Sequence, residues 1–272
     1  MTTITAPEIG GLKARLKETW SAGNYDRFSR YMEQGARMFY EQLDVPPGCE
    51  LLDVACGSGQ LALWAARDRV NVTGVDIAPN LVQRAQDRAR AEGLNARFLE
   101  GDAEALPFED ASFDVVSSLY GAMFAPRPDY VARELLRVCA PGGSIVMGNW
   151  TPGGFVGQMF KIFGRFIAPT GMPAPVLWGE KAVVRERLGA GASEIRMQYR
   201  TCTFSYPFPP ADVVEFFRKY YGPANRAFAS LDASEATALR RALEDLWSSS
   251  NVGGEEITVV PAEYLEVVAI RA

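Results

Sequence analysis

The amino-acid sequence predicts an α/β fold, in which helices cover both faces of a seven-stranded, mostly parallel β-sheet. The first reason is the order of the segments: from about residue 49 to residue 150, short apolar runs alternate with helical patterns. The second is that these runs are continuous, as in parallel strands covered on both faces. The third is a glycine turn, Gly57-Ser58-Gly59, between the first run and a helical pattern. Right-handed crossovers are expected to join the strands.

The composition is that of one compact unit that can bury its own core. Of the 272 residues, 48% are hydrophobic and 22% are charged, and 28 Lys and Arg stand against 33 Asp and Glu. This balance disfavours a nucleic-acid partner, because such proteins usually present a basic face. We expect three parts: a helical lid at 1–45, a Rossmann-like core that binds a ligand at 46–150, and the remaining sheet with a substrate-side cap at 151–272.

The chain contains four cysteines and no histidine, which is a poor set of ligands for a metal site. The cysteines lie far apart in the sequence, so we expect buried free thiols in a reducing compartment and no bound metal.

The first residues lack the basic and apolar regions of a signal peptide, and no run of about 18 apolar residues occurs. We therefore expect a cytoplasmic protein without a membrane span.

Residues 11 to about 43 show helical spacing, with a break near Gly23. Leu12, Leu16 and Trp20 recur every four residues and define one apolar face. Two interpretations are open. The segment is either a packing layer on the sheet or a lid over the ligand, with Tyr25 near the edge of that lid.

The core region is expected to contain five strands and three helices. Pro79 suits the first turn of a helix, and Gly93 suits its end. The expected strands are 49–55, 70–76, 96–100, 113–119 and 144–150, and the expected helices are 60–68, 79–92 and 128–138.

Beyond Trp150 the sequence becomes rich in aromatic residues and glycine, and further helices and strands follow. Because two helical patterns fall between the last two strands, we expect a helical cap inserted into the sheet. The expected elements are a helix at 180–188, a strand at 197–206, helices at 210–221 and 233–249, and a final strand at 263–270.

The glycine turn is the first candidate binding feature. Gly57 and Gly59 allow a sharp turn and a close approach of ligand to backbone, and the following helix directs free N–H groups to the same place. The run from Gly57 to Ala62 also satisfies the GxGxxA pattern of dinucleotide-binding proteins. The turn alone therefore indicates a nucleotide-like ligand without saying which one.

Three acids at successive strand ends narrow the choice of ligand. Asp53 lies inside the first strand, where a carboxylate is costly unless a polar group such as an amino group engages it. Asp76 matches the two hydroxyls of a ribose, and Asp102 can accept from an adenine amino group. Structural alternatives remain open: Asp53 could cap the turn, Asp76 could cap the next helix, and Asp102 could be an ordinary loop acid.

In this order and spacing, five motifs resemble those of class I S-adenosylmethionine-dependent methyltransferases. Within that class, the chain is similar to the branch that includes ubiquinone and menaquinone biosynthesis enzymes, the type 11 methyltransferases. The resemblance extends from about Val45 to Trp150. The motifs run from Leu52 to Gly59, Gly74 to Asp76, Gly101 to Phe108, Phe113 to Val116 and Leu136 to Gly143.

The resemblance implies that S-adenosylmethionine is bound and S-adenosylhomocysteine is released. It places the methionine moiety against the glycine turn and its amino end near Asp53. It also places the ribose on Asp76, and the adenine between Ile77 and the pair Asp102 and Ala103. The implied cofactor-binding residues are Asp53, Ala55, Gly57, Gly59, Asp76, Ile77, Asp102, Ala103 and Leu119. Tyr25 lies outside the resemblance and is added as a candidate cofactor-binding residue from the lid interpretation of the N-terminal helices.

The acceptor is expected to be a small apolar or aromatic molecule. The aromatic segment after Trp150 is the candidate for its pocket, and the alternative that this segment forms the core of the cap stays open. Tyr120, Phe155 and Trp178 are the candidate substrate-binding residues, and no catalytic base is identified because histidine is absent. Two other functions stay open: an S-adenosylmethionine-binding protein without catalysis, and an NAD-dependent oxidoreductase. The oligomeric state is left open between monomer and homodimer.

Overall fold

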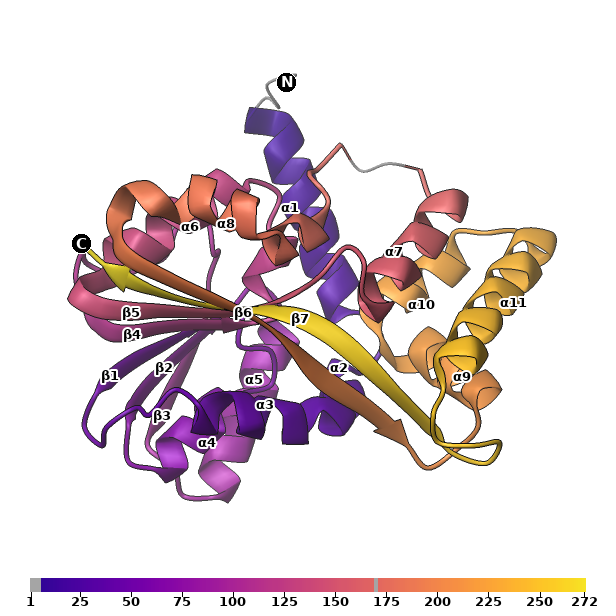
Figure 1. The fold of residues 1–272 in the computed structure, drawn as a ribbon, viewed down its shortest axis with the longest axis horizontal. Helices are drawn as coiled ribbons and strands as arrows, with labels where there is room; N and C mark the ends of the chain where they lie inside the picture. The colour runs from indigo at the N-terminus through magenta and orange to yellow at the C-terminus, as the bar shows by residue number, and fades with distance from the viewer. Residues whose placement is uncertain (1–5, 169–170) are drawn as a thin grey trace.

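The computed structural model describes residues 6–168 and 171–272. A single seven-stranded sheet runs through it in the order β3-β2-β1-β4-β5-β7-β6 (Figure 1). All pairings from β3 to β5 are parallel, whereas β7 is antiparallel to both of its neighbours, β5 and β6. The strands are β1 (Glu50–Val54), β2 (Asn71–Asp76), β3 (Ala96–Glu100), β4 (Phe113–Leu119), β5 (Cys139–Trp150), β6 (Ala192–Tyr206) and β7 (Thr258–Arg271).

Helices cover both faces of this sheet, which confirms the predicted α/β architecture. In Figure 1, α6 and α8 lie on one face, and α3, α4 and α5 lie on the other. The helices are α1 (Ala6–Ser21), α2 (Tyr25–Ser29), α3 (Glu33–Glu41), α4 (Ala62–Arg67), α5 (Pro79–Ala91), α6 (Pro128–Val138), α7 (Phe155–Phe166), α8 (Lys181–Leu188), α9 (Pro210–Tyr220), α10 (Gly222–Ala229) and α11 (Ala233–Ser250). Short 3₁₀ turns are η1 (Arg30–Met32), η2 (Ala122–Phe124), η3 (Pro175–Gly179) and η4 (Gly189–Gly191).

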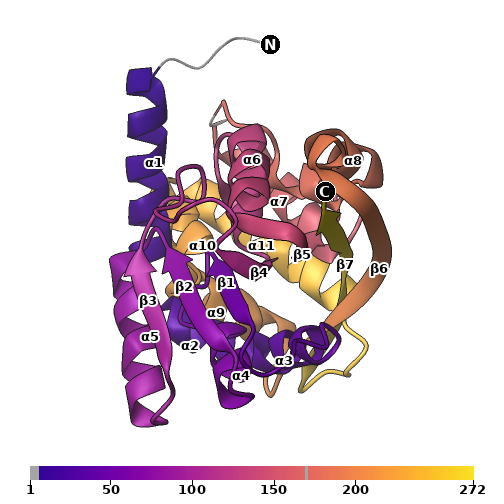
Figure 2. The same ribbon diagram turned by 90° about the vertical axis from the view of Figure 1, so that its left-hand side faces the viewer.

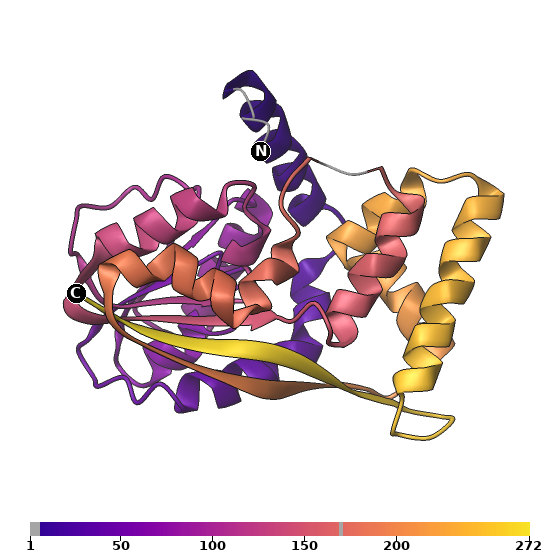
Figure 3. The ribbon, with the colours of Figure 1, turned by 45° about the horizontal axis from the view of Figure 1, so that its top comes forward.

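A helical cap is inserted between β6 and β7. The helices α9, α10 and α11 follow β6 in the chain and precede β7, and α7 packs against α11 (Figures 1 and 3). The predicted insertion of helices between the last two strands is therefore what the chain forms. The two strands that flank the cap are longer than predicted. β6 begins at Ala192, whereas the predicted strand begins at residue 197, and β7 begins at Thr258, whereas the predicted strand begins at residue 263.

Two cap helices were not predicted from the sequence. The aromatic segment after Gly154 forms α7, and its buried residues, among them Phe155, Met159 and Phe163, recur every four residues along one face. The abundance of aromatic residues and glycine concealed this period. The helix α10 begins at Gly222-Pro223, a pair that reads as a turn but also suits the first helical positions.

The N-terminal segment packs between the core and the cap. The helix α1 contacts both α5 and α10, and α2 contacts both α5 and α9. Figure 2 shows α1 rising above the β3 edge of the sheet. In the part of the chain that the structure describes, no helix is long and apolar enough to cross a membrane.

Candidate active site

The glycine turn after β1 forms the floor of a cavity at the carboxyl ends of the parallel strands. Gly57 and Gly59 adopt φ values of +56° and +85°, in the left-handed region that favours glycine. A Cβ on Gly59 would lie 3.1 Å from Cγ of Leu63, so a larger residue would also disturb the packing of the following helix. The helix α4 begins only at Ala62, later than expected, because the turn continues through Gln60 and Leu61.

Asp76 joins this turn to the start of α5. Its Oδ2 accepts a hydrogen bond from the backbone N–H of Gly57 at 2.9 Å, and its Oδ1 accepts from the N–H of Ala78 at 2.8 Å. Its residue is 7% exposed, and this burial raises the pKa of the carboxyl group to about 6 despite the backbone donors. Asp76 is not the N-cap of α5, because that position is Ala78 and no side chain caps the helix. The two backbone bonds of Asp76 are compatible with ribose binding, because each carboxylate oxygen accepts more than one hydrogen bond.

Asp53 is a buried acid with few compensating donors. It is 2% exposed, and the Ser117 hydroxyl donates to its Oδ1 over a long 3.4 Å. Burial raises the pKa of Asp53 to about 7, with a smaller contribution in the same direction from the negative charge of Asp76. A cationic ligand group beside Asp53 would stabilise its ionised form, which is what the ammonium of an amino acid could supply.

Asp102 follows β3 and is already engaged by the N-terminal helix. Its Oδ1 accepts from the N–H of Glu104 at 2.9 Å, and its Oδ2 lies 2.5 Å from Nζ of Lys13 on α1. The same Lys13 ammonium is 2.6 Å from the fully buried carboxylate of Glu104, which also pairs with Arg127 at 2.7 Å. Asp102 is thus more than an ordinary loop acid, since it anchors α1 over this end of the cavity.

Comparison with known proteins agrees with this geometry. Residues 52–147 match the family model described as a methyltransferase domain. The chain is 36% identical over 252 residues to an uncharacterised protein of Mycobacterium tuberculosis, an alignment covering 90% of this chain and 92% of that protein. It is 36% identical over 160 residues to the demethylmenaquinone methyltransferase of Thermus thermophilus, covering 54% of this chain and 71% of that enzyme. The chain belongs to the class I S-adenosylmethionine-dependent methyltransferases, in the type 11 branch.

A solved structure supports the fold of this methyltransferase. A putative methyltransferase from Bacillus halodurans superposes with a TM-score of 0.59 at 19% identity, covering 86% of this chain and 97% of that one. In the residues that the structure describes, no group of three or more His, Cys, Asp or Glu is placed to hold a metal ion. The four cysteines, Cys49, Cys56, Cys139 and Cys202, are free and buried, as expected from their spacing.

The methyltransferase brings nearly all of the predicted cofactor-binding residues to one cavity. Tyr25 reaches it from α2, and a Cβ on Gly57 would lie 3.4 Å from the Tyr25 ring. Gly59 is the exception: it faces Leu63 and Ala85 in the packed interior and does not line the cavity. The predicted residues that line the cavity are Tyr25, Asp53, Ala55, Gly57, Asp76, Ile77, Asp102, Ala103 and Leu119.

Of the predicted substrate-binding residues, Tyr120 lines the cavity, whereas Phe155 and Trp178 do not. Tyr120 lines the cavity, and its ring stacks on Trp150 with centroids 3.8 Å apart. Phe155 is instead packed into the cap against Trp247, with centroids 4.5 Å apart. Trp178 is 1% exposed and lies under the guanidinium of Arg187. Phe155 and Trp178 are not lining residues, because the helical face that contains Phe155 and the 3₁₀ turn that contains Trp178 both point into packed interior.

A second, apolar wall of the cavity was missed by sequence reasoning. Trp20 and Leu16 come from α1, Met32 from η1, and Phe124 from η2. Trp20 and Phe124 meet edge to face, with ring centroids 5.0 Å apart. The four-residue spacing of Leu16 and Trp20 marked an apolar face, but nothing in the sequence showed that this face borders the ligand. Phe124 carried no signal at all.

Proposed function

We propose that this methyltransferase transfers the methyl group of S-adenosylmethionine to a small apolar or aromatic acceptor. The observation that supports the proposal is that two chemically different sets of residues line one cavity. Acids and the glycine turn line it at the strand ends, and apolar and aromatic side chains from α1, η1 and η2 line it as well. A polar, zwitterionic donor suits the first set, the proposed donor end, and an acceptor with an apolar body suits the second, the proposed acceptor end.

On this proposal, the donor lies across the carboxyl ends of β1, β2 and β3. Asp53 receives the ammonium of the methionine moiety, and Gly57 lies against that moiety. Asp76 accepts from the ribose hydroxyls with the lone pairs left free by its two backbone donors. Ile77 and Ala103 flank the adenine, and Asp102 takes its amino edge next to Lys13.

The reaction would be a displacement in line with the sulfonium bond, so the main task of the protein is to align the two reactants in a dry site. Tyr120, beside the predicted transfer region, is a poor base, because burial raises the pKa of its hydroxyl and keeps it protonated. We therefore favour an acceptor whose nucleophile is already ionised, or carries a free lone pair, near neutral pH.

A screen with labelled S-adenosylmethionine over phenols, quinones, carboxylic acids and amines tests the proposal. We expect label transfer to one or more apolar members of this library. Transfer confined to nucleic-acid or protein acceptors would contradict the proposed acceptor class. Tight binding of S-adenosylhomocysteine without transfer to any acceptor would instead indicate a binding protein without catalysis.

A further inference from the structure

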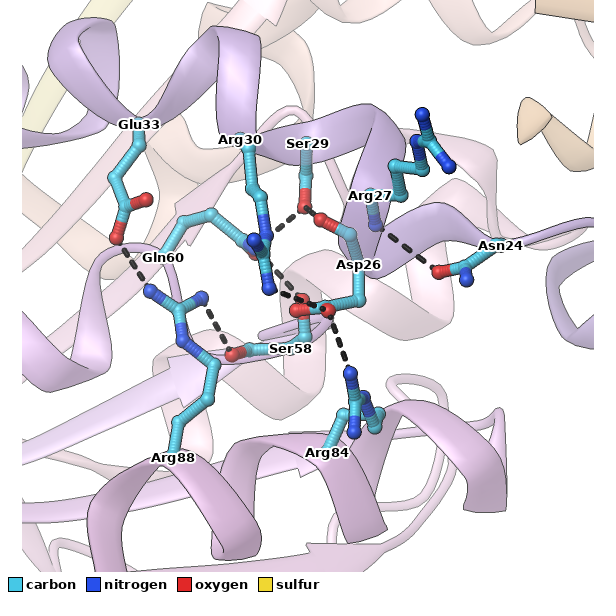
Figure 4. Close-up of polar contacts among 10 residues, drawn as sticks. All are labelled: Asn24, Asp26, Arg27, Ser29, Arg30, Glu33, Ser58, Gln60, Arg84 and Arg88. Atoms are coloured by element: carbon cyan, nitrogen blue, oxygen red, sulfur yellow. Dashed lines mark hydrogen bonds and ion pairs between the residues drawn. The ribbon is translucent and has the colours of Figure 1, made fainter. Parts of the chain in front are cut away.

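A polar network joins the N-terminal segment to the glycine turn (Figure 4). Its central residue is Arg88 on α5, which does not line the cavity. The Nη1 atom of Arg88 donates to the carbonyl oxygen of Ser58 at 3.1 Å, and its Nη2 atom donates to the carboxylate of Glu33 at the start of α3. One guanidinium therefore contacts the middle residue of the turn and the N-terminal segment together.

The contacted carbonyl lies just outside the cavity, between two residues of the turn that line it, Gly57 and Gln60. Ser58 lies between Gly57 and Gly59 and is fully buried. Holding this carbonyl outward fixes the orientation of the peptide that it shares with Gly59, and limits rotation of the neighbouring peptide. The N–H of Gly59 donates to the carbonyl oxygen of Cys56 at 3.0 Å, which holds the same peptide from its other side. Since Gly57 and Gln60 line the cavity on either side of this peptide, the backbone that they present to a ligand depends on the contact with Arg88.

A second link reinforces the first from the side of the ligand. The Nε2 atom of Gln60 donates to the hydroxyl of Ser58 at 2.7 Å and to that of Ser29 at 2.6 Å. Ser29 is buried on α2 and donates in turn to the carbonyl of Asp26 at 3.2 Å. The turn is thus held by its carbonyl through Arg88 and by its side chain through Gln60, and both links end on the N-terminal segment.

We propose that Arg88 is a positioning residue for the donor, which orients the glycine turn while Glu33 holds the guanidinium in place. This inference rests on the proposed donor site and adds to it a dependence of donor affinity on the docking of α3. Arginine is required because its planar fork can serve both partners at once, whereas a lysine ammonium is a single point donor.

The chain offers a matched control one turn earlier on the same helix. Arg84 also joins α5 to the N-terminal segment, through Oδ2 of the buried Asp26 at 3.1 Å, but among the residues that the structure describes it makes no hydrogen bond or ion pair with the glycine turn. After Arg84→Met, Asp26 keeps Arg30 as a partner, with its Nη2 atom 3.5 Å away. Both variants remove one ion pair between α5 and the N-terminal segment, to α2 for Arg84 and to α3 for Arg88, and only Arg88→Met also removes a donor to the turn.

The experiment measures the affinity for S-adenosylhomocysteine by calorimetry and the melting temperature of each variant. We expect Arg88→Met to weaken binding about tenfold, the scale of one lost hydrogen bond from a charged donor, and Arg84→Met to change it less than about twofold. Arg88→Lys should recover part of the loss, and Glu33→Gln should weaken binding by an intermediate amount. Equal losses in Arg88→Met and Arg84→Met would overturn the inference.

The same set of measurements also covers a variant that does not fold and a wild-type chain that does not bind the ligand. If Arg88→Met does not fold, hydrogen exchange at the amides of Gly57 to Gln60 is compared between the wild-type chain and Arg88→Lys. Faster exchange in the variant supports the inference, and unchanged exchange overturns it. If the wild-type chain fails to bind S-adenosylhomocysteine, the proposed donor site itself fails, which is seen before any variant is compared.

Discussion

The two proposed ends of the cavity are built in different ways. The proposed donor end comes from contiguous motifs of neighbouring strands, where Asp53 precedes the last residue of β1, Asp76 closes β2 and Asp102 follows β3. The acceptor end comes from single residues on α1, η1 and η2, such as Trp20, Met32 and Phe124, which are far apart in the chain. A parallel sheet brings its strand ends to one edge by construction, whereas a wall of helices has no such rule.

This difference predicts that variants at the two ends separate donor affinity from acceptor affinity. The largest effect is expected for Asp76→Ala, which removes the proposed ribose contacts and releases the N–H groups of Gly57 and Ala78. We expect S-adenosylhomocysteine to bind about 100-fold more weakly by calorimetry, about 3 kcal/mol for several lost bonds to a buried carboxylate.

The control for this variant is Asp87→Ala on the exposed side of α5, where the acid contacts only Gln83 and Arg90 in the described structure. It should leave the affinity for S-adenosylhomocysteine unchanged. An Asp76→Ala protein that folds and still binds with wild-type affinity would contradict the donor role of Asp76.

The second expected effect lies at the proposed acceptor end. Trp20→Ala removes an aromatic wall that contacts Tyr25 and Phe124, with ring centroids 5.7 Å and 5.0 Å away. We expect the KM of an acceptor found in the screen to rise about 20-fold, the scale of one large apolar side chain, and the affinity for S-adenosylhomocysteine to change less than about threefold. Equal losses for donor and acceptor would show that the two ends are not separate.

The sequence predicted the two ends with unequal success for a physical reason. The alternation of strands and helices and the positions of Asp53, Asp76 and Asp102 follow from runs of continuous residues, so they could be inferred without a structure. The acceptor wall depends on how α1 and η2 pack, and such packing leaves no local pattern. Phe155 and Trp178 illustrate this limit. Both were predicted to bind the substrate because they are aromatic, but aromatic residues are also common in packed cores, and both are buried there and do not line the cavity.

The third prediction concerns the pH dependence of donor binding. Burial raises the pKa of Asp53 to about 7, so in the free protein this carboxyl group holds a proton at pH 6 and has largely lost it at pH 8. An arriving ammonium favours the ionised form, so binding below pH 7 must release that proton. Affinity for S-adenosylhomocysteine should therefore fall about tenfold from pH 8 to pH 6.

Calorimetry in buffers with different ionisation enthalpies counts the released protons directly. We expect about half a proton per ligand at pH 7, and none for Asp53→Asn. A proton count that is unchanged in Asp53→Asn would assign the release to another group.

The raised pKa of Asp53 also affects folding stability. The folded chain binds this proton more tightly than the unfolded chain, so the contribution of Asp53 to stability is present at low pH and is lost as pH rises through about 7.

The smallest effect is expected where the two ends meet. Lys13 lies on the helix that supplies Leu16 and Trp20 to the acceptor wall, and its ammonium pairs with Asp102 at the donor end. The pair is partly exposed, and Glu104 keeps Arg127 as a partner, so Lys13→Met should change the free energy of unfolding by only about 1 kcal/mol. We expect S-adenosylhomocysteine to dissociate about threefold faster in stopped-flow measurements, since α1 is then held less firmly over the proposed adenine end.

Lys17→Met is the matched control, because Lys17 pairs with the exposed Glu100 outside the cavity and should leave the dissociation rate unchanged. Equal acceleration in both variants would mean that α1 responds to any lost surface charge, and that Lys13 does not couple the two ends.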